Sequence, residues 1–298
     1  MVQQNRLFHV GLFQRKVGVN VMYVLDIRNK LSHTLALLFL SSYPSHWQDF
    51  FPTLYQFLKP STPSQTVTPT FNRHTCTLFL HLLIEISGEV ADSILKGARD
   101  FSEARHQRDA AVRDCIREND SKGISDVVLA IISETEARLV AARNGAAPDE
   151  QGPLIDGISL SVRAFASLIR EHFTISYFPW ANPCYPAWIN VNFTVTPDTL
   201  PLLFRLLSDP SLPIRVETAN AFVRMIQKGL KEPSDKLQLI RVLSLGDIIP
   251  DLEQATRGEE VQEQFREGLG KLTNALGLEL CKLVEEVPLD LCPMCYLV

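Results

Sequence analysis

The segment Ile27–Leu58 constrains the fold of this chain more than any other stretch. Its first half carries apolar residues every three or four positions, which places them on one face of a helix: Ile27, Leu31, Leu35, Leu38 and Phe39. Tyr43-Pro44 ends this helix, because proline lacks a backbone donor and restricts the residue before it. Ser45 and Gln48 then predict a capping box that begins a second amphipathic helix. Each helix has more apolar surface than its partner can cover, which is typical of stacked helical pairs.

Composition limits what kind of protein this is. The 298 residues are 46% hydrophobic, which is enough apolar content for a sizeable core, and the formal charge is -5. A protein that binds nucleic acid over its whole surface would be basic, so a nucleic-acid role here requires a local cationic patch. The six cysteines show no framework spacing, and we expect them to be reduced thiols of an intracellular protein.

Neither a membrane span nor a secretory signal is expected. The longest aliphatic run, Leu35–Leu40, is far shorter than the ~20 residues of a spanning helix. Near the amino terminus, basic residues interrupt the apolar stretches and no small-residue cleavage site follows them. We therefore predict no membrane insertion.

Helical periodicity continues along most of the chain. It predicts helices over residues 71–86, 89–95, 99–122, 124–140 and 160–169, of which the third is highly charged. Residues 59–70 and 143–153 are rich in Pro, Gly or small polar residues, and they predict a surface loop and a flexible linker. Residues 172–187 combine prolines with aromatic residues and cannot extend a helix, so we interpret them as an atypical insertion.

The clearest repeat unit is Asp198–Leu230. Its first helix has leucines in L-x-x-L-L spacing and ends at Asp209-Pro210, and its second carries small residues that allow helices to approach closely. Arg215 is expected to reach carboxylates on adjacent turns or repeats. A further pair is predicted over residues 236–245 and 259–284, with a loop between them. The unit resembles a HEAT repeat, so the expected fold is an all-α, HEAT-repeat helical solenoid of stacked antiparallel helix pairs.

A more specific resemblance begins in the opening segment. Ile27-Arg28-Asn29-Lys30 is followed by the aliphatic run Leu35–Leu40 and then by aromatic residues at Tyr43, Trp47 and Phe50-Phe51. This combination resembles the amino-terminal region of the exportin-T family of nuclear transport receptors. Three later pieces agree with that family in order: Arg113–Glu118, Trp188–Asn190 and Asp235–Ile240.

The resemblance covers about residues 25–283, and members of that family are several times longer than this chain. It implies an atypical N-terminal extension over 1–24, a HEAT-repeat array over 25–284 and an atypical C-terminal tail over 285–298. The array then contains the linker near 143–153 and the insertion at 172–187. We hypothesise that the atypical segments are retained intron sequence or mispredicted ends of the gene.

The function that the resemblance implies is nuclear export of tRNA. Such a receptor binds tRNA cooperatively with the small GTPase Ran in its GTP form and carries it through the nuclear pore to the cytoplasm. Contacts with nuclear pore proteins and shuttling between nucleus and cytoplasm follow from the same resemblance. One alternative is a generic HEAT-repeat scaffold or adaptor that holds protein partners. Another is a chain left non-functional by incomplete repeats.

Seven cations are candidates for contact with RNA phosphate or with the GTPase: Arg28, Lys30, Arg105, Arg108, Arg113, Arg117 and Lys122. Arg113 and Arg117 lie four residues apart, and we expect them to project together, away from Asp114 and Glu118, as a phosphate clamp. The alternative is that Asp109 pairs with Arg113 and the helix is simply solvated.

No catalytic constellation appears in the chain. The histidines lack metal-ligand spacing, and there is neither a Gly-rich phosphate loop nor a nucleophile elbow. Cys292-Pro293-Met294-Cys295 is a lone C-x-x-C without the second pair that a zinc site requires. We therefore expect no enzyme, no cofactor, no metal and no small-molecule substrate.

Overall fold

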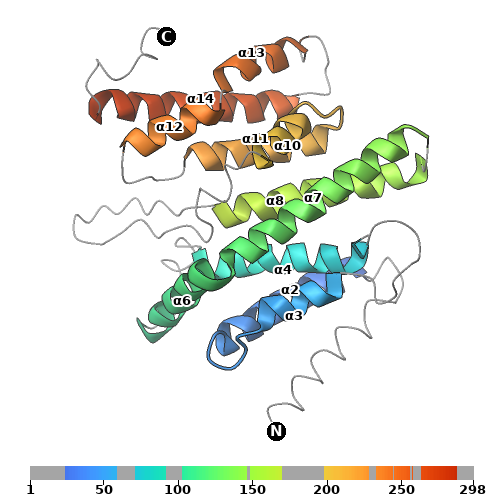
Figure 1. Cartoon of the computed structure of the whole chain (residues 1–298), viewed down its shortest axis with the longest axis vertical. Coiled ribbons are helices and arrows are strands. Elements are labelled where there is room, and N and C mark those ends of the chain that lie inside the picture. Colours follow the sequence, from blue (N-terminus) through green and yellow to red (C-terminus); the bar gives the residue numbers. More distant parts are fainter. Residues whose placement is uncertain are drawn as a thin grey trace. The chain divides into compact units, whose positions relative to one another are not determined.

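The computed structural model describes residues 24–58, 71–91, 103–145, 148–169, 198–227, 233–243, 245–255, 257 and 263–286. Across these ranges every regular element is helical and no strand occurs, which confirms the all-α prediction. The chain divides into two compact units, Met1–Glu89 and Val90–Val298 (Figure 1). The predicted loop at 59–70 and the insertion at 172–187 lie outside the described residues, as does nearly all of both terminal regions.

The first unit contains the predicted opening pair of helices. Its helices are α2 (Val24–Ser42), α3 (Phe50–Leu58) and α4 (Arg73–Ala91). As expected, α2 ends directly before Tyr43-Pro44. The helix predicted over residues 71–86 is confirmed and extends to Ala91, so the start of the short helix predicted over 89–95 belongs to α4.

An aromatic cluster joins α2 to α3. The Phe39 ring is fully buried, and its centroid lies 4.7 Å from that of Tyr43, 4.5 Å from Phe50 and 5.4 Å from Phe51. Ring pairs at these separations contribute about 0.5–1.5 kcal/mol beyond the burial of their area. The stripe of apolar residues that predicted the pair is therefore the surface that holds it together.

The predicted capping box at Ser45 is wrong. Residues 43–49 form turns, and α3 begins only at Phe50. The reason is Pro52, which has no backbone N–H and is tolerated only in the first turn of a helix. A helix that began at Ser45 would place Pro52 in its interior, where the ring clashes with a carbonyl of the preceding turn.

The second unit begins with one long helical run in three parts. These are α6 (Glu103–Cys115), a π-helical turn (Ile116–Asp120) and α7 (Ser121–Arg143). The residues that flank the π-helical turn, Cys115 and Ser121, both have right-handed helical backbone angles, so the helix continues through it. The sequence predicted two separate helices here, and the break between them does not exist.

The other described helices of the second unit are α8 (Gln151–Ile169), α10 (Thr199–Leu207), α11 (Leu212–Ile226), α12 (Pro233–Leu243), α13 (Leu245–Ala255) and α14 (Glu263–Glu286). Helix α11 contacts α8 on one side and α14 on the other. Helix α7 packs on α8, α10 on α11, and both α12 and α13 on α14 (Figure 1). Successive helical pairs therefore pack on one another, as a HEAT-repeat solenoid requires.

Helix α11 lies at the centre of this packing. Phe222 is fully buried, and its ring stacks on Phe204 of α10 at a centroid distance of 5.3 Å. On the side facing α14, the Cβ atom of Ala219 lies 3.5 Å from the position that a Cβ atom on Gly268 would occupy. The repeat predicted over Asp198–Leu230 is confirmed, including the small residues that allow close approach.

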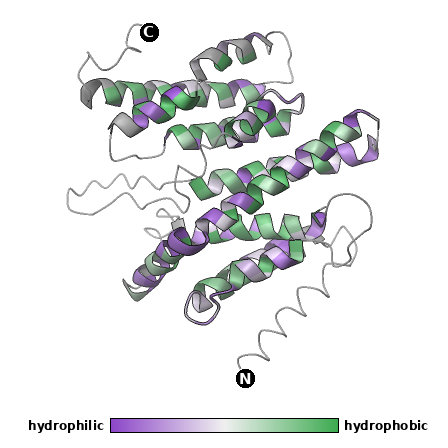
Figure 2. Cartoon of the chain, viewed as in Figure 1, coloured by the Kyte–Doolittle hydropathy of each residue, from purple (hydrophilic) through white to green (hydrophobic). Residues whose placement is uncertain are grey.

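Among the described residues one helix, Pro148–Ile169, is long and apolar enough to cross a membrane. Figure 2 shows α8 largely in the hydrophobic colour. Its apolar residues Ile158, Val162 and Phe165 are fully buried, and α7 and α11 both pack against this helix. The core helix of a layered protein satisfies the same criteria of length and composition, so this helix is weak support for a membrane span.

The last helical layer departs from the prediction. Residues expected to form a loop contain α13, in spite of Pro250 in its interior. A buried ion pair links α12 to α14, with Lys236 Nζ 3.1 Å from Glu279 Oε2, and the same ammonium donates to the Ile226 carbonyl at the end of α11. Lys236 thereby ties three helices together.

Candidate nucleic-acid or GTPase interface

Five of the seven candidate cations lie along the run from α6 to α7, and we call them the cation row: Arg105, Arg108, Arg113, Arg117 and Lys122. The first two flank a buried carboxylate. Arg105 Nε lies 3.8 Å and Arg108 Nη2 lies 3.6 Å from oxygens of Asp109, which is 1% exposed. Asp109 is thus held between cations on its own helix.

The next two members of the row share a different carboxylate. Arg113 Nε lies 3.4 Å and Arg117 Nη2 lies 3.5 Å from Asp114 Oδ1. The prediction that these arginines project away from Asp114 is wrong. Arg117 lies three residues from Asp114 and is its neighbour on the helix surface, and the side chain of Arg113 reaches back to the adjacent carboxylate. Arg113 is also only 7% exposed, so it is poorly placed for a ligand.

Lys122, the last member of the row, pairs with Asp126 at 2.7 Å on the exposed surface of α7. Every cation of the row therefore has a carboxylate within 4 Å, and the row is a surface of mixed charge. The exposed pair of the row, Lys122–Asp126, contributes little to stability, so a charged ligand can displace it at small cost.

The other two candidates lie in the first unit, on α2. Lys30 is exposed. Arg28 is half-buried, and burial lowers the pKa of its guanidinium. Within the described ranges its Nε atom has no hydrogen-bond partner. Arg28 is therefore the less solvated of the two cations on this helix.

An ion pair between distant elements has no counterpart in the sequence prediction. Arg143, at the end of α7, donates two hydrogen bonds of 2.7 Å to Asp209 and a third of 2.7 Å to Ser211 Oγ. The backbone N–H of Ser211 also donates to Asp209, at 2.7 Å. Asp209-Pro210 indicated a turn, but no local pattern links that turn to a residue 66 positions earlier.

Arg143 also belongs to the segment predicted as a linker. There α7 ends at Arg143, Gly145 adopts φ +95°, and a 3-10 turn (Pro148–Glu150) leads into α8. Positive φ favours glycine because it has no Cβ atom. The described residues of the predicted linker, 143–145 and 148–153, thus form the end of α7, a turn and the start of α8.

Asp209 provides a pH-dependent prediction. Its burial raises the pKa of the carboxyl, but hydrogen bonds from Arg143 and Ser211 outweigh burial and hold the pKa below the usual range. A lowered folded-state pKa stabilises the protein above the unfolded value of about 3.9, and this stabilisation is lost as pH falls through the folded value.

We expect Asp209→Asn to lower the free energy of unfolding at neutral pH by about 1.5–3 kcal/mol, because a charged hydrogen-bonded pair is lost. Urea unfolding of both chains should show the difference shrinking below about pH 4. Asp126→Asn, in the exposed pair with Lys122, is the control and should change little. An undiminished difference in acid would contradict this account of Asp209.

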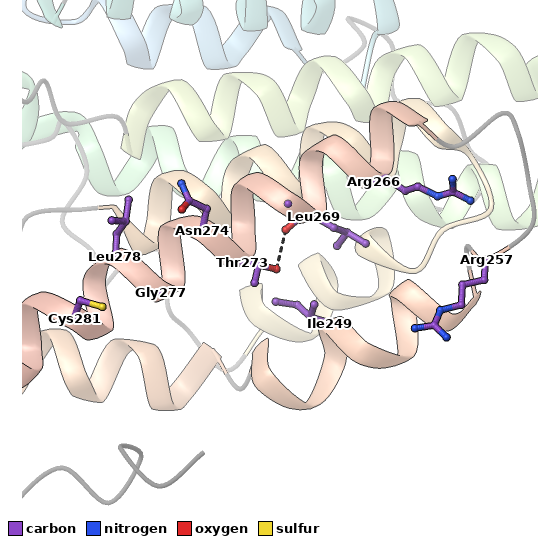
Figure 3. Close-up of a pocket in the computed structure, with 10 residues that line it drawn as sticks. Ile249, Arg257, Arg266, Leu269, Thr273, Asn274, Gly277, Leu278 and Cys281 are labelled. Carbon is purple, nitrogen blue, oxygen red and sulfur yellow. Dashed lines mark hydrogen bonds between the residues drawn. The ribbon is translucent and has the colours of Figure 1, made fainter. Parts of the chain in front are cut away.

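A groove of about 920 Å³ lies between α13 and α14 (Figure 3). Arg257 and Arg266 lie toward one end of it and Cys281 toward the other. Inside, Thr273 Oγ1 donates to the Leu269 carbonyl of its own helix at 3.0 Å. Among the described residues that line the groove there is no histidine or carboxylate.

We also searched the described part of the chain for side chains that together could hold a metal ion. No cluster of three or more His, Cys, Asp or Glu side chains occurs there. Three cysteines in these ranges, Cys76, Cys115 and Cys281, are free thiols. The Cys292–Cys295 motif lies outside the described residues.

Comparison with known proteins identifies the family. Residues 26–222 match the family model described as Exportin 1-like protein. The chain is 46% identical to Exportin-T of Coprinopsis cinerea over 274 residues, covering 89% of this chain and 24% of that relative. It is 44% identical to Exportin-T of Laccaria bicolor over 266 residues, covering 87% and 23%. Exportin-T of Mycosarcoma maydis is 34% identical over 282 residues, covering 87% and 24%.

The chain thus spans about a quarter of the length of these relatives. The family match includes both helical units, from α2 to Phe222 of α11. It agrees with the stacked helical pairs described above and with the resemblance inferred from the opening segment. The chain belongs to the exportin family, and the relatives that it resembles within that family are Exportin-T proteins.

Proposed function

We propose that this protein acts as a nuclear export receptor that binds tRNA cooperatively with GTP-bound Ran and carries it through the nuclear pore to the cytoplasm. The observation that carries the proposal is the identity of 46% and 44% with two proteins named Exportin-T. Under this proposal the protein contacts nuclear pore proteins, shuttles between nucleus and cytoplasm, and has no enzymatic role.

The stacked helices suit two ligands that must bind together. Each helical pair contacts only its neighbours, so small changes at successive boundaries add up to a change in curvature of the array. Two ligands that both contact the same curved state increase each other's affinity, and the increase is equal for both because coupling is reciprocal. RNA would be recognised through its phosphates and its A-form shape.

The cation row favours the GTPase over RNA phosphate as its ligand. Each cation of the row already lies beside a carboxylate, and a phosphate bound there would be repelled by Asp114 and Asp126. A protein surface can present both signs of charge and pair with both members of each ion pair. Within the row, Arg108 and Lys122 are the most exposed cations and the best placed for such contacts.

The test is tRNA binding to the chain with and without GTP-loaded Ran. We expect the GTPase to raise tRNA affinity by roughly 5–150-fold, the range of typical allosteric coupling, and tRNA to raise GTPase affinity by the same factor. Affinity for tRNA should fall linearly with salt on logarithmic axes, because phosphate contacts release counterions. Equal tRNA affinity with and without the GTPase would favour the generic scaffold instead.

Charge reversal tests the assignment of the cation row. Arg108→Glu should slow association with GTP-loaded Ran, because charges at an interface rim mainly affect the association rate. Lys271→Glu is the matched control, since Lys271 is an exposed cation on α14 that also lies beside a carboxylate. A loss of tRNA binding without loss of GTPase binding in Arg108→Glu would assign the row to RNA.

A further inference from the structure

Three arginine–carboxylate pairs cross one boundary in the second unit, between the pair α7–α8 and the pair α10–α11. We call them the ionic clamp: Arg143–Asp209, Arg205–Glu136 and Arg163–Glu217. Each is doubly hydrogen-bonded. The donor–acceptor distances are 2.7 and 2.7 Å in the first pair, 2.9 and 2.8 Å in the second, and 3.0 and 2.5 Å in the third.

The three pairs hold the boundary at three different places. Arg205–Glu136 joins α10 to α7, Arg163–Glu217 joins α8 to α11, and Arg143–Asp209 joins the end of α7 to the turn between α10 and α11. Because the pairs lie on different elements, neither a tilt nor a slide of one helical pair against the other can preserve all three. In the Asp209 and Glu136 pairs the two bonds end on different carboxylate oxygens and so fix orientation as well as distance, whereas both bonds of Arg163 end on Glu217 Oε1.

Burial of the carboxylates distinguishes these pairs from ordinary surface pairs. The carboxylates of Asp209, Glu217 and Glu136 are only 9%, 16% and 15% exposed, whereas those of the exposed pairs on α7 and α14 are 60% and 63% exposed. The guanidinium groups of Arg163 and Arg205 are 56% and 58% exposed, so salt still screens these two pairs, but leaving a partly buried carboxylate unpaired is costly. Opening the clamp would therefore cost more free energy than separating three exposed ion pairs.

Lys236 bridges the Ile226 carbonyl at the end of α11 to Glu279 of α14, and the other contacts described at this neighbouring boundary are of a different kind from the clamp. There Ala219 packs against Gly268, and the guanidinium of Arg215 lies 4.7 Å from the centroid of the Phe265 ring. The prediction that Arg215 reaches a carboxylate is thus replaced by a cation–π contact among the described residues. Apolar contacts and ring faces tolerate small displacements, because they have no fixed donor–acceptor direction.

We propose that the ionic clamp locks α7, α8, α10 and α11 into one rigid block, and that the array changes curvature at the boundary between α11 and α14. This rigid block follows from contacts within the chain, so it does not depend on which ligands the protein binds. A change in curvature at the clamp would have to break three doubly bonded pairs, whereas a shift of α14 on α11 disturbs one polar bridge among the described residues, through the side chain of Lys236.

The test compares distance distributions across the two boundaries in the full chain. Paired labels at the exposed positions Asp156 and Gln227 report on the clamp, and labels at Gln227 and Asn274 report on the α11–α14 boundary. A ketone-bearing amino acid carries the labels, so the native cysteines stay unchanged. We expect the clamp distribution to be the narrower one in dilute buffer.

Glu136→Arg should broaden the clamp distribution about twofold in dilute buffer, since the arginine pair becomes a repulsion. Adding Arg205→Glu should narrow it again, because the reversed pair restores the attraction. Asp126→Lys is the matched control: it also reverses the charge of a carboxylate in an ion pair of α7, but its partner Lys122 lies on the same helix. Circular dichroism checks that helical content is unchanged.

Two outcomes would overturn the proposal. One is a clamp distribution that is at least as broad as the α11–α14 distribution in the unaltered chain. The other is a clamp distribution that stays equally narrow in Glu136→Arg, in the double reversal and in high salt, which would mean that apolar packing alone holds the block. The salt titration of the unaltered chain decides this even if Glu136→Arg does not fold.

Discussion

Phe222→Ala is expected to lower the free energy of unfolding by about 3–5 kcal/mol, the usual cost of removing a large aromatic ring from a close-packed core. Phe222 is fully buried in α11, between helices that belong to two different layers, and its ring stacks on Phe204. Its loss would leave a cavity that rigid neighbouring helices cannot fill.

Urea unfolding followed by circular dichroism measures this loss. Phe204→Ala is the matched control, because it removes the other ring of the same stacked pair from a half-buried position. It should cost clearly less than Phe222→Ala, since part of its surface is already in contact with water. Equal costs for the two variants would show that the stacking contact, and not burial, determines the stability of this region.

Glu279→Ala is expected to lower the free energy of unfolding by about 3–5 kcal/mol, because it leaves the Lys236 ammonium buried without the carboxylate that faces it. Both side chains are largely buried, at 6% and 12% exposure. Adding Lys236→Met should recover much of the loss, since no unpaired charge then remains in the interior.

Helix α14 offers its own control for this variant. Glu267 pairs with Lys271 at 2.6 Å, which is closer than the 3.1 Å between Glu279 and Lys236, but Glu267 is exposed to solvent. Glu267→Ala should therefore unfold at nearly the same urea concentration as the unaltered chain. If Glu267→Ala cost as much as Glu279→Ala, burial would not be what distinguishes the two pairs.

Most of the helices could be predicted from the sequence, because each buries one stripe of apolar residues and that stripe has the period of a helix. The pair α10–α11 is the clearest case. Helix α13 was missed because its Gly, Asp and Pro residues are typical of loops, and only packing on α14 outweighs that preference. The capping box at Ser45 does not form, because a helix that began there would contain Pro52 in its interior.

The candidate site was less accessible to sequence reasoning. Charged residue types identified the cation row, but the row's acidic partners depend on which side chains share a helix face. The ionic clamp could not be predicted from the sequence, because its partners lie between 54 and 69 positions apart in the chain. Such pairs form only where the fold brings two helices together, and no spacing rule connects them.

The π-helical turn Ile116–Asp120 has a consequence for how the protein could change during evolution. Each residue of an α-helix turns the chain by about 100°, so a turn with one extra residue rotates everything before it relative to everything after it. If the buried positions of α7 were continued toward the N-terminus at the spacing of an α-helix, Arg117 would be buried. The residues that are buried there are instead Ile116 and Val112. The extra residue of the π-helical turn therefore determines which charged residues of α6 are exposed to solvent. Deleting one residue there would rotate α6 by about 100° relative to α7 and expose a different set of charges.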